Sequence, residues 1–112
     1  MRLPGAERAV VDPTKVRDYL LSPEHPVGRH KARFFSALGF DRAAWPVLHG
    51  ILLGVAREGD AIEGAATPYG RKYEVQGIIE GPAGRTAEIV TVWIILVGED
   101  FPRLVTAYPG GS

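Results

Sequence analysis

The sequence has no cysteine, so it forms no disulfide bond and no thiolate-bound metal centre. Long apolar runs are also missing: the stretch VTVWIILV is far shorter than the ~20 residues that a membrane-spanning helix needs, and it is typical of a buried strand. Neither sign of charge dominates, because 13 Lys and Arg residues balance 13 Asp and Glu residues. This balance argues against general, charge-driven nucleic-acid binding but leaves room for a local basic patch.

Targeting and cofactor motifs are lacking as well. The first residues, MRLPGAERAV, have no apolar segment of a signal peptide, so we expect a cytoplasmic protein or an effector delivered without a cleaved signal. The chain has no phosphate-binding glycine loop, nucleophile elbow or dinucleotide-binding motif, and its three histidines do not have metal-ligand spacing. We therefore expect no metal, no cofactor and no membrane contact.

The length and composition that are present indicate one globular domain. A hydrophobic content of 46% is ordinary for such a protein, and a chain of 112 residues buries about two-thirds of its unfolded surface, which is enough for a single core. The sequence has no internal repeat and no linker. It therefore predicts a single domain over residues 1–112, with residues 110–112 as a frayed tail.

Helix signals fill the first half of the chain. Asp12 and Pro13 are typical of an N-cap and a first helical residue, and the prolines of SPEHPVG end that helix. Gly39 fits the left-handed position after a second helix. Asp41 caps a third helix. Pro46 is tolerated near the first turn of this helix, or it delays the start. Three helices are expected, over residues 13–21, 30–38 and 42–57.

Strand signals fill the second half. Alternating or β-branched segments are separated by the turn sequences GPAG and GEDFP. Four strands are expected, over residues 61–66, 71–81, 86–97 and 103–108. Because helices come first and strands follow, the predicted fold class is α+β, with the N-terminal helices packed on one face of a four-stranded antiparallel meander.

The most apolar strand divides into two faces by period-two counting. We expect one set to face the helices: Val90, Val92, Ile94 and Leu96. Thr91 and Trp93 would then lie on the open face of the sheet, where hydroxyls and aromatics can bind a ligand. Alternatively, the N-terminal arm covers Trp93 and the threonines are ordinary strand formers.

The last strand alternates in the same way. Placing Val105 and Ala107 under the helices leaves Thr106 and Tyr108 on the open face. For the strand over residues 71–81, the sequence does not decide which alternate set joins that face.

Cationic and titratable residues gather in the stretch SPEHPVGRHKARFF, where a loop enters a helix. Lys31 shares a helical face with Phe34, Phe35 and Leu38, so it lies at the rim of the core. A lysine at a helix N-terminus opposes the helix dipole, which indicates a role in binding an anion. The alternative is that its stem packs and its ammonium reaches water.

The histidines allow several roles. His25, in the loop, suits general acid–base catalysis because imidazole is the side chain most often used for it, although a lone loop histidine is more often a surface residue. His30 begins the helix, where it caps, binds phosphate or does neither. His49 falls off the apolar stripe and is interpreted as structural.

Three long segments resemble a known family: LPGAERAVVDPTKVRDYLLSPEHPVGRHKARFFSALGF, YGRKYEVQGIIEGPAGRTAEIVTVWII and DFPRLVTAYP. The family contains bacterial and phage domains found as standalone proteins and at the C-terminus of phage head-morphogenesis proteins and polymorphic toxins. The resemblance covers Leu3 to Pro109. Its most specific parts are H-P-x-G-x-x-K, from His25 to Lys31, and the ending P-x-L-V-T-A-Y-P.

Such domains are similar to the barnase–EndoU–colicin–RelE superfamily of metal-independent endoribonuclease toxins, which has helices followed by a four-stranded antiparallel sheet. The resemblance implies cleavage of RNA by attack of the 2′-hydroxyl and neutralisation by a cognate antitoxin or immunity protein. The catalytic residues that it implies are His25 as base or acid, Lys31 as electrostatic stabiliser, Arg71 on a phosphate, and Thr91, Thr106 and Tyr108 as hydrogen-bond donors. The implied substrate-binding residues are His30, Tyr69, Tyr73 and Trp93.

Two other functions remain open at this stage. A neutral chain departs from the basic character common among ribonuclease toxins, so the domain is alternatively a non-catalytic protein-binding module of the adaptor, antitoxin or immunity type. It is also alternatively a structural domain in which Lys31 pairs with Glu24 or Asp41. An enzyme would bring His25, Lys31 and a strand hydroxyl into one hydrogen-bonded network.

Overall fold

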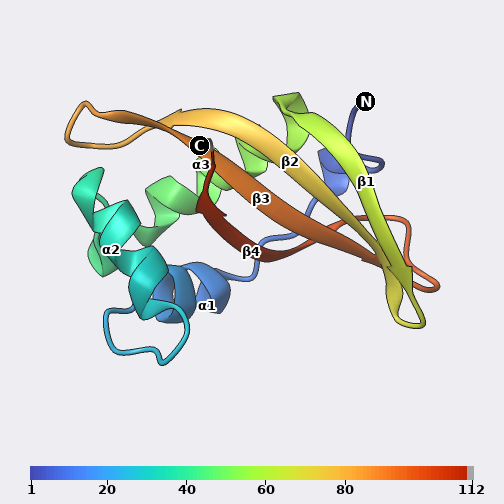
Figure 1. The fold of residues 1–112 in the computed structure, drawn as a ribbon, viewed down its shortest axis with the longest axis horizontal. Helices are drawn as coiled ribbons and strands as arrows, with labels where there is room; N and C mark the ends of the chain where they lie inside the picture. Colours follow the sequence, from blue (N-terminus) through green and yellow to red (C-terminus); the bar gives the residue numbers. More distant parts are fainter. Residues whose placement is uncertain (111–112) are drawn as a thin grey trace.

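The computed structural model describes residues 1–110, which form the predicted α+β domain (Figure 1). The helices precede a four-stranded antiparallel sheet with strand order β1-β2-β3-β4. The helical segments are Ala6–Arg8 (η1), Pro13–Lys15 (α1), Val16–Leu20 (η2), Arg29–Ala37 (α2), Arg42–Ala44 (η3) and Trp45–Glu58 (α3). The strands are Asp60–Thr67 (β1), Gly70–Glu80 (β2), Thr86–Leu96 (β3) and Arg103–Pro109 (β4). No helix within residues 1–110 is long and apolar enough to span a membrane.

The first helix begins as its sequence predicts and then widens. The carboxylate of Asp12 accepts a hydrogen bond from the Thr14 amide at 2.9 Å, and Pro13 occupies the first turn. From Val16 the helix continues as the π-helical segment η2, in which the Leu21 amide donates to the Val16 carbonyl five residues earlier. The wider turn sets the position of Tyr19, at the centre of the site described below.

The other two helices also match their predicted signals. Helix α2 is followed by Gly39, whose φ of 97° lies in the left-handed region that glycine adopts without strain. Asp41 accepts from the Ala44 amide at 2.9 Å and caps η3. Helix α3 then starts at Trp45, so Pro46 delays the helix rather than interrupting it.

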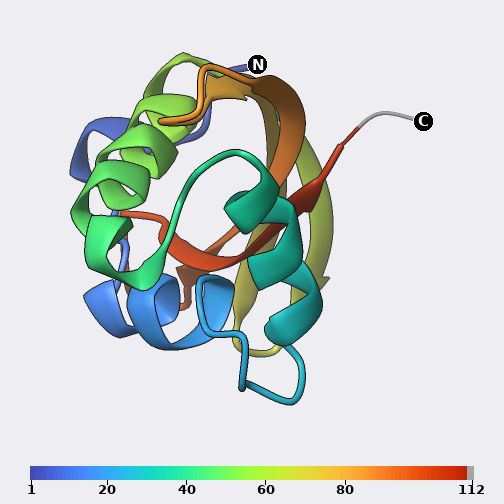
Figure 2. The ribbon, with the colours of Figure 1, turned by 90° about the vertical axis from the view of Figure 1, so that its left-hand side faces the viewer.

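The helices cover one face of the sheet (Figure 2). Strands β1 and β4 are its edges, and their pairing is irregular: the register shifts between Glu63 and Ala66 in β1 and at Val92 and Trp93 in β3 against β4. Val10 extends the sheet at the start of β4 by a parallel bridge to Arg103.

The predicted assignment of the two faces of β3 is wrong. Ile89, Thr91 and Trp93 are fully buried toward the helices, and Val92 and Ile94 lie on the opposite face. Both sets are largely apolar, so the alternation alone does not decide the burial. Trp93 is the largest fully buried side chain of the described residues, and its polar N–H has a hydrogen-bond acceptor in the core, which favours the observed orientation.

The prediction for β4 is partly correct. Ala107 is buried under the helices, and the register places Thr106 opposite Val92 and Tyr108 opposite Val90, on the open face. The bulge, however, leaves Val105 without a partner and gives the buried position to Leu104 instead. A single extra residue therefore changes the alternation at this end of the strand.

Candidate functional site

Side chains from four separate segments meet around Tyr19, beside strand β4. The hydroxyl of Tyr19 lies 3.2 Å from that of Thr106 on β4. The ammonium groups of Lys15 and Lys31 lie 5.4 and 5.6 Å from the centroid of the Tyr19 ring. The His25 ring contacts the same ring edge-on, with centroids 4.9 Å apart. We call these five residues, Lys15, Tyr19, His25, Lys31 and Thr106, the Tyr19 cluster.

The H-P-x-G-x-x-K motif explains how the loop and helix close on Tyr19. His25 Nδ1 accepts hydrogen bonds from the amides of Val27 and Gly28, at 3.0 and 2.9 Å, and so folds the loop around its own ring. A Cβ on Gly28 would lie 2.1 Å from the Tyr19 carbonyl oxygen, so only glycine permits this approach. Three residues later, Lys31 reaches the Tyr19 ring from the first turn of α2.

The hydrogen bonds of His25 restrict its chemistry. Because Nδ1 accepts from two backbone amides, the neutral ring carries its proton on Nε2. In this arrangement Nε2 is a hydrogen-bond donor, and no nitrogen has a free lone pair to accept a proton. The geometry therefore fits His25 as a donor to an anion better than as a general base.

Neither lysine of the cluster forms an ion pair in the part of the chain that the structure describes, so the predicted alternative of a Lys31 pair with Glu24 or Asp41 is not seen. Asp12 is the carboxylate near Lys15, but it accepts its hydrogen bonds from Thr14. The neighbouring carboxylate, Asp18, is held instead by Arg17 at 3.0 Å and Arg42 at 2.8 Å. Two ammonium groups thus share one aromatic ring without a carboxylate between them, which favours an anionic ligand.

The surroundings of Tyr19 act in opposite directions on its hydroxyl. Burial raises the pKa of the Tyr19 hydroxyl, but the contact with Thr106 and the nearby charges of Lys31 and Lys15 lower it, and the net result is a pKa below the usual value for tyrosine. The cluster therefore stabilises negative charge at this oxygen. The same electrostatic environment would stabilise a bound anion.

A second polar pair lies on the open face of the sheet, next to the cluster. The Tyr108 hydroxyl donates to the Glu74 carboxylate at 3.4 Å. Burial, together with the Glu74 charge, raises the pKa of Tyr108. Because Glu74 pairs with Val92 and Val92 with Thr106, the carboxylate and the Tyr19 cluster stand on either side of one apolar residue.

Three predicted site residues are buried and cannot contact a substrate. Thr91 and Trp93 are fully buried, and Tyr73 is 6% exposed beneath the helices. The Thr91 hydroxyl donates to the Val75 carbonyl at 2.8 Å and accepts from Trp93 Nε1 at 2.7 Å. The predicted roles of Thr91 in catalysis and of Trp93 and Tyr73 in stacking on a base are therefore wrong, because the Thr91 hydroxyl is used inside the core and both aromatic rings are buried there.

The remaining predicted residues fall into two groups. His25, Lys31 and Thr106 meet in the cluster, and Tyr108 lies beside it. Arg71 and Tyr69 lie instead at the β1–β2 hairpin, at the opposite end of the long axis from the start of α2 (Figure 1). Arg71 pairs there with Glu63 at 3.4 Å, and Tyr69 is 76% exposed.

His30 is exposed in the first turn of α2, directly before Lys31. Sequence reasoning missed Lys15, Tyr19 and Glu74. The spacing of Lys15 and Tyr19, four residues apart on a helix, was the available signal, since such side chains are neighbours. No local pattern in the sequence identifies Glu74, because the sheet face on which it lies depends on how β2 pairs with β3.

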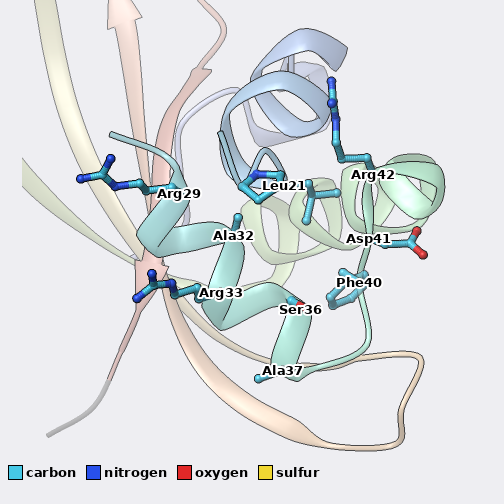
Figure 3. Close-up of a pocket in the computed structure, with 10 residues that line it drawn as sticks. Leu21, Arg29, Ala32, Arg33, Ser36, Ala37, Phe40, Asp41 and Arg42 are labelled. Atoms are coloured by element: carbon cyan, nitrogen blue, oxygen red, sulfur yellow. The ribbon is translucent and has the colours of Figure 1, made fainter. Parts of the chain in front are cut away.

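A cavity of about 700 Å³ lies on another side of α2 (Figure 3). Leu21, Ala32 and Phe40 form its apolar wall, and Arg29 and Arg33 extend from α2 away from Phe40. None of the five residues of the Tyr19 cluster lines it. Its charged lining residues are Arg29, Arg33, Arg42 and Asp41, and the Asp41 carboxylate is used to cap η3. An apolar wall with a few charged groups suits the binding of a ligand or partner.

Comparison with known families assigns the chain to one of them. A family model with the description "Domain of unknown function (DUF6883)" matches residues 2–111. The chain belongs to this family. The match spans the Tyr19 cluster and all four strands, so the site is part of the DUF6883 domain itself. Comparison with curated proteins finds no match.

A solved structure shares the fold of this DUF6883 domain. It is described as a contact-dependent growth inhibition toxin–immunity protein complex from Klebsiella pneumoniae 342. One of its chains is similar with a TM-score of 0.70, over 96% of the DUF6883 chain and 98% of that chain, at 16% sequence identity. At this identity the likeness establishes the arrangement of helices and strands.

Proposed function

We propose that this DUF6883 domain is a toxin domain that cleaves RNA without a metal ion, by attack of a 2′-hydroxyl on the adjacent phosphodiester. The observation that carries the proposal is the convergence of two unpaired ammonium groups, two hydroxyls and an imidazole N–H in the Tyr19 cluster. These groups are the donors that bind a phosphate and stabilise the charge that develops on it.

The chemistry follows from the position of the donors. The ammonium groups of Lys15 and Lys31 contact the non-bridging phosphate oxygens, where negative charge increases in the transition state. The Nε2–H of His25 donates a further hydrogen bond to the same group. Attack of the 2′-oxygen expels the 5′-oxygen and leaves a 2′,3′-cyclic phosphate, so the substrate is RNA rather than DNA.

Cleavage assays with excess chelator test this function. The intact protein should cleave RNA and leave an otherwise identical 2′-deoxy oligonucleotide intact. Lys31→Met and Lys15→Met should each lower kcat/KM by about 10²-fold, since each removes a charge that stabilises the transition state. Arg57→Met is the matched control, because it removes one positive charge at the end of α3 and outside the cluster. The proposal is refuted if the protein cleaves none of the RNA classes tested, or if it cleaves RNA without chelator but not when chelator is added.

A toxin role also requires a neutralising partner. The similar chain belongs to a complex of a growth-inhibition toxin with its immunity protein, which supports a cognate immunity or antitoxin protein for this domain. Because that complex contains a toxin and an immunity protein, the similarity supports an immunity-type role for this domain as much as a toxin role.

The cavity beside α2 favours this second candidate, a non-catalytic protein-binding domain. Its apolar wall and about 700 Å³ of volume are typical of a site that receives side chains of a partner. In that case RNA is not cleaved, and Ser36→Trp, which adds a large side chain at an exposed position of the cavity lining, weakens partner binding while Lys31→Met does not. The two candidate functions therefore predict opposite effects of these two substitutions.

A further inference from the structure

We propose that Tyr19 and Glu74 form the acid–base pair of this site, with Tyr19 donating the proton to the leaving 5′-oxygen and Glu74 accepting the proton of the attacking 2′-hydroxyl. This inference rests on the proposed ribonuclease function and assigns the two proton transfers within it. Sequence analysis gave neither residue such a role.

The sheet register sets the separation of the two groups. Glu74 pairs with Val92, and Val92 pairs with Thr106, whose hydroxyl contacts that of Tyr19 at 3.2 Å. Two neighbouring strand spacings place the backbones of Glu74 and Thr106 about 10 Å apart. A phosphodiester seated over Val92 would therefore have the Glu74 carboxylate on one side and the Tyr19 hydroxyl on the other, as an in-line displacement requires.

Tyr19 has the surroundings of a proton donor. Lys15 approaches its ring from α1 and Lys31 from α2, and both ammonium groups stabilise the phenolate that forms when the proton leaves. Thr106 can donate to the Tyr19 oxygen, so that the tyrosine proton points to the substrate. Asp18 pairs with Arg17 and Arg42, and Asp12, the carboxylate near Lys15, caps α1 by accepting from Thr14. The charges that act on the Tyr19 hydroxyl are therefore those of the two lysines.

Glu74 has the surroundings of a proton acceptor. Its carboxylate is exposed on the open face and forms no ion pair with any described residue, so one of its oxygens is available to the substrate. The Tyr108 hydroxyl donates to its Oε1 and positions the group. His25, the other candidate for this role, presents an N–H rather than a lone pair.

The proposed step balances without an outside reactant. The bond from the 2′-oxygen to phosphorus forms as the 2′-hydroxyl proton passes to Glu74. The bond from phosphorus to the 5′-oxygen breaks as the Tyr19 proton passes to that oxygen. The products are a 2′,3′-cyclic phosphate and a 5′-hydroxyl, and one proton returns from Glu74 to Tyr19 through solvent.

Leaving-group substitution tests the two roles separately. The probe is a short RNA in which one bridging 5′-oxygen is sulfur, because a thiolate leaves without protonation. On ordinary RNA, Tyr19→Phe and Glu74→Gln should each reduce single-turnover cleavage by about 10²–10⁴-fold. On the sulfur-bridged RNA, Tyr19→Phe should regain a rate within about 10-fold of the unsubstituted protein, whereas Glu74→Gln should stay slow.

Two further measurements separate catalysis from folding and binding. RNA binding should not weaken in either variant, since neither substitution removes charge from the lysines. Thermal unfolding should stay cooperative in both, with a small loss of stability in Tyr19→Phe because its hydroxyl contact with Thr106 is removed. The pH–rate profile tests the acid role of Tyr19 in a folded protein. Lys15→Met should move the high-pH limb to higher pH, because the loss of this cation raises the pKa of the Tyr19 hydroxyl. Tyr108→Phe should act as a positioning change and give a milder loss.

Equal defects of Tyr19→Phe on both RNAs overturn the acid role, and rescue of Glu74→Gln by sulfur overturns the base role. If both variants cleave ordinary RNA within threefold of the unsubstituted protein, this inference fails and the ribonuclease function stands. If the unsubstituted protein cleaves neither RNA, the proposed function fails and this inference fails with it.

Discussion

Substitution of Thr91 by valine tests whether this residue is structural. The side chain is fully buried, and its hydroxyl joins the Trp93 indole N–H to the Val75 carbonyl. No buried side-chain polar atom lacks a partner in the part of the chain that is described. Valine keeps the shape but leaves the indole N–H buried without an acceptor. An orphaned buried donor costs about 1–3 kcal/mol, so with the second lost bond we expect about 2–3 kcal/mol of destabilisation.

Urea unfolding measures this free energy directly. Thr91→Val should lower the urea midpoint without changing the slope, and the melting temperature should fall by about 10 °C in a domain of this size. Thr86→Val is the matched control, because Thr86 is exposed at the start of the same strand, and it should change stability by less than about 0.5 kcal/mol. Under the proposed ribonuclease function, Thr91→Val should cleave RNA as the unsubstituted protein does at a temperature well below its melting point.

A double-mutant cycle isolates the hydrogen bond. Trp93→Phe removes the donor that Thr91→Val leaves without an acceptor. In the Trp93→Phe background, the loss of unfolding free energy caused by Thr91→Val should therefore be smaller by at least about 1 kcal/mol. A Thr91→Val protein within about 0.5 kcal/mol of the unsubstituted one would refute the buried network. If the proposed RNA cleavage is lost in a Thr91→Val protein that is stably folded, Thr91 acts in catalysis and its structural role does not explain the result.

Three further outcomes follow from the local geometry. Gly39→Ala should destabilise the domain more than Gly84→Ala: both glycines have positive φ, but an added Cβ at Gly39 lies 2.6 Å from the Ala83 amide nitrogen, whereas at Gly84 nothing lies within 4 Å, and equal urea midpoints would contradict this. Gly28→Ala should both destabilise the fold and lower RNA cleavage, because its Cβ meets the Tyr19 carbonyl; unchanged cleavage would separate the loop from the site. The hydrogen bonds from Arg17 and then Arg42 lower the pKa of Asp18, so the stability that its charge contributes is present above the unfolded-state pKa of about 3.9 and is lost as the pH falls through the lower folded-state value. The difference in urea midpoint between the unsubstituted protein and Asp18→Asn should therefore be largest near neutrality and vanish in acid, and a difference independent of pH would contradict the assignment.

Local signals in the sequence predicted most of the fold. Asp12, Gly39 and Asp41 act at helix ends through their own backbone or side chain, so a few neighbouring residues are enough to identify them. The strands and their antiparallel order follow from turn residues and alternation in the same way. The faces of β3 did not follow, because Thr91 and Val92 are equally acceptable in a strand and only the packing of Trp93 between helices and sheet selects one orientation.

The site was predicted in part for a similar reason. His25 and Lys31 belong to one continuous motif, and their approach to a common point was predictable from the loop-to-helix junction. Tyr19 lies in the preceding helix and reaches Thr106, 87 residues further on, through a π-helical turn that the helical periodicity did not reveal. The position of Glu74 depends on the register of β2 against β3, and its separation from Thr106 depends also on the register of β3 against β4.

The two irregular edges of the sheet affect how copies of this domain meet. At the β4 edge, the backbone of Val10 already hydrogen-bonds with the Pro102 carbonyl and the Leu104 amide. At the β1 edge, the pairing with β2 is interrupted between Glu63 and Ala66. An incoming strand would find only short runs of free amides and carbonyls in register, so edge-to-edge polymerisation is disfavoured at high concentration.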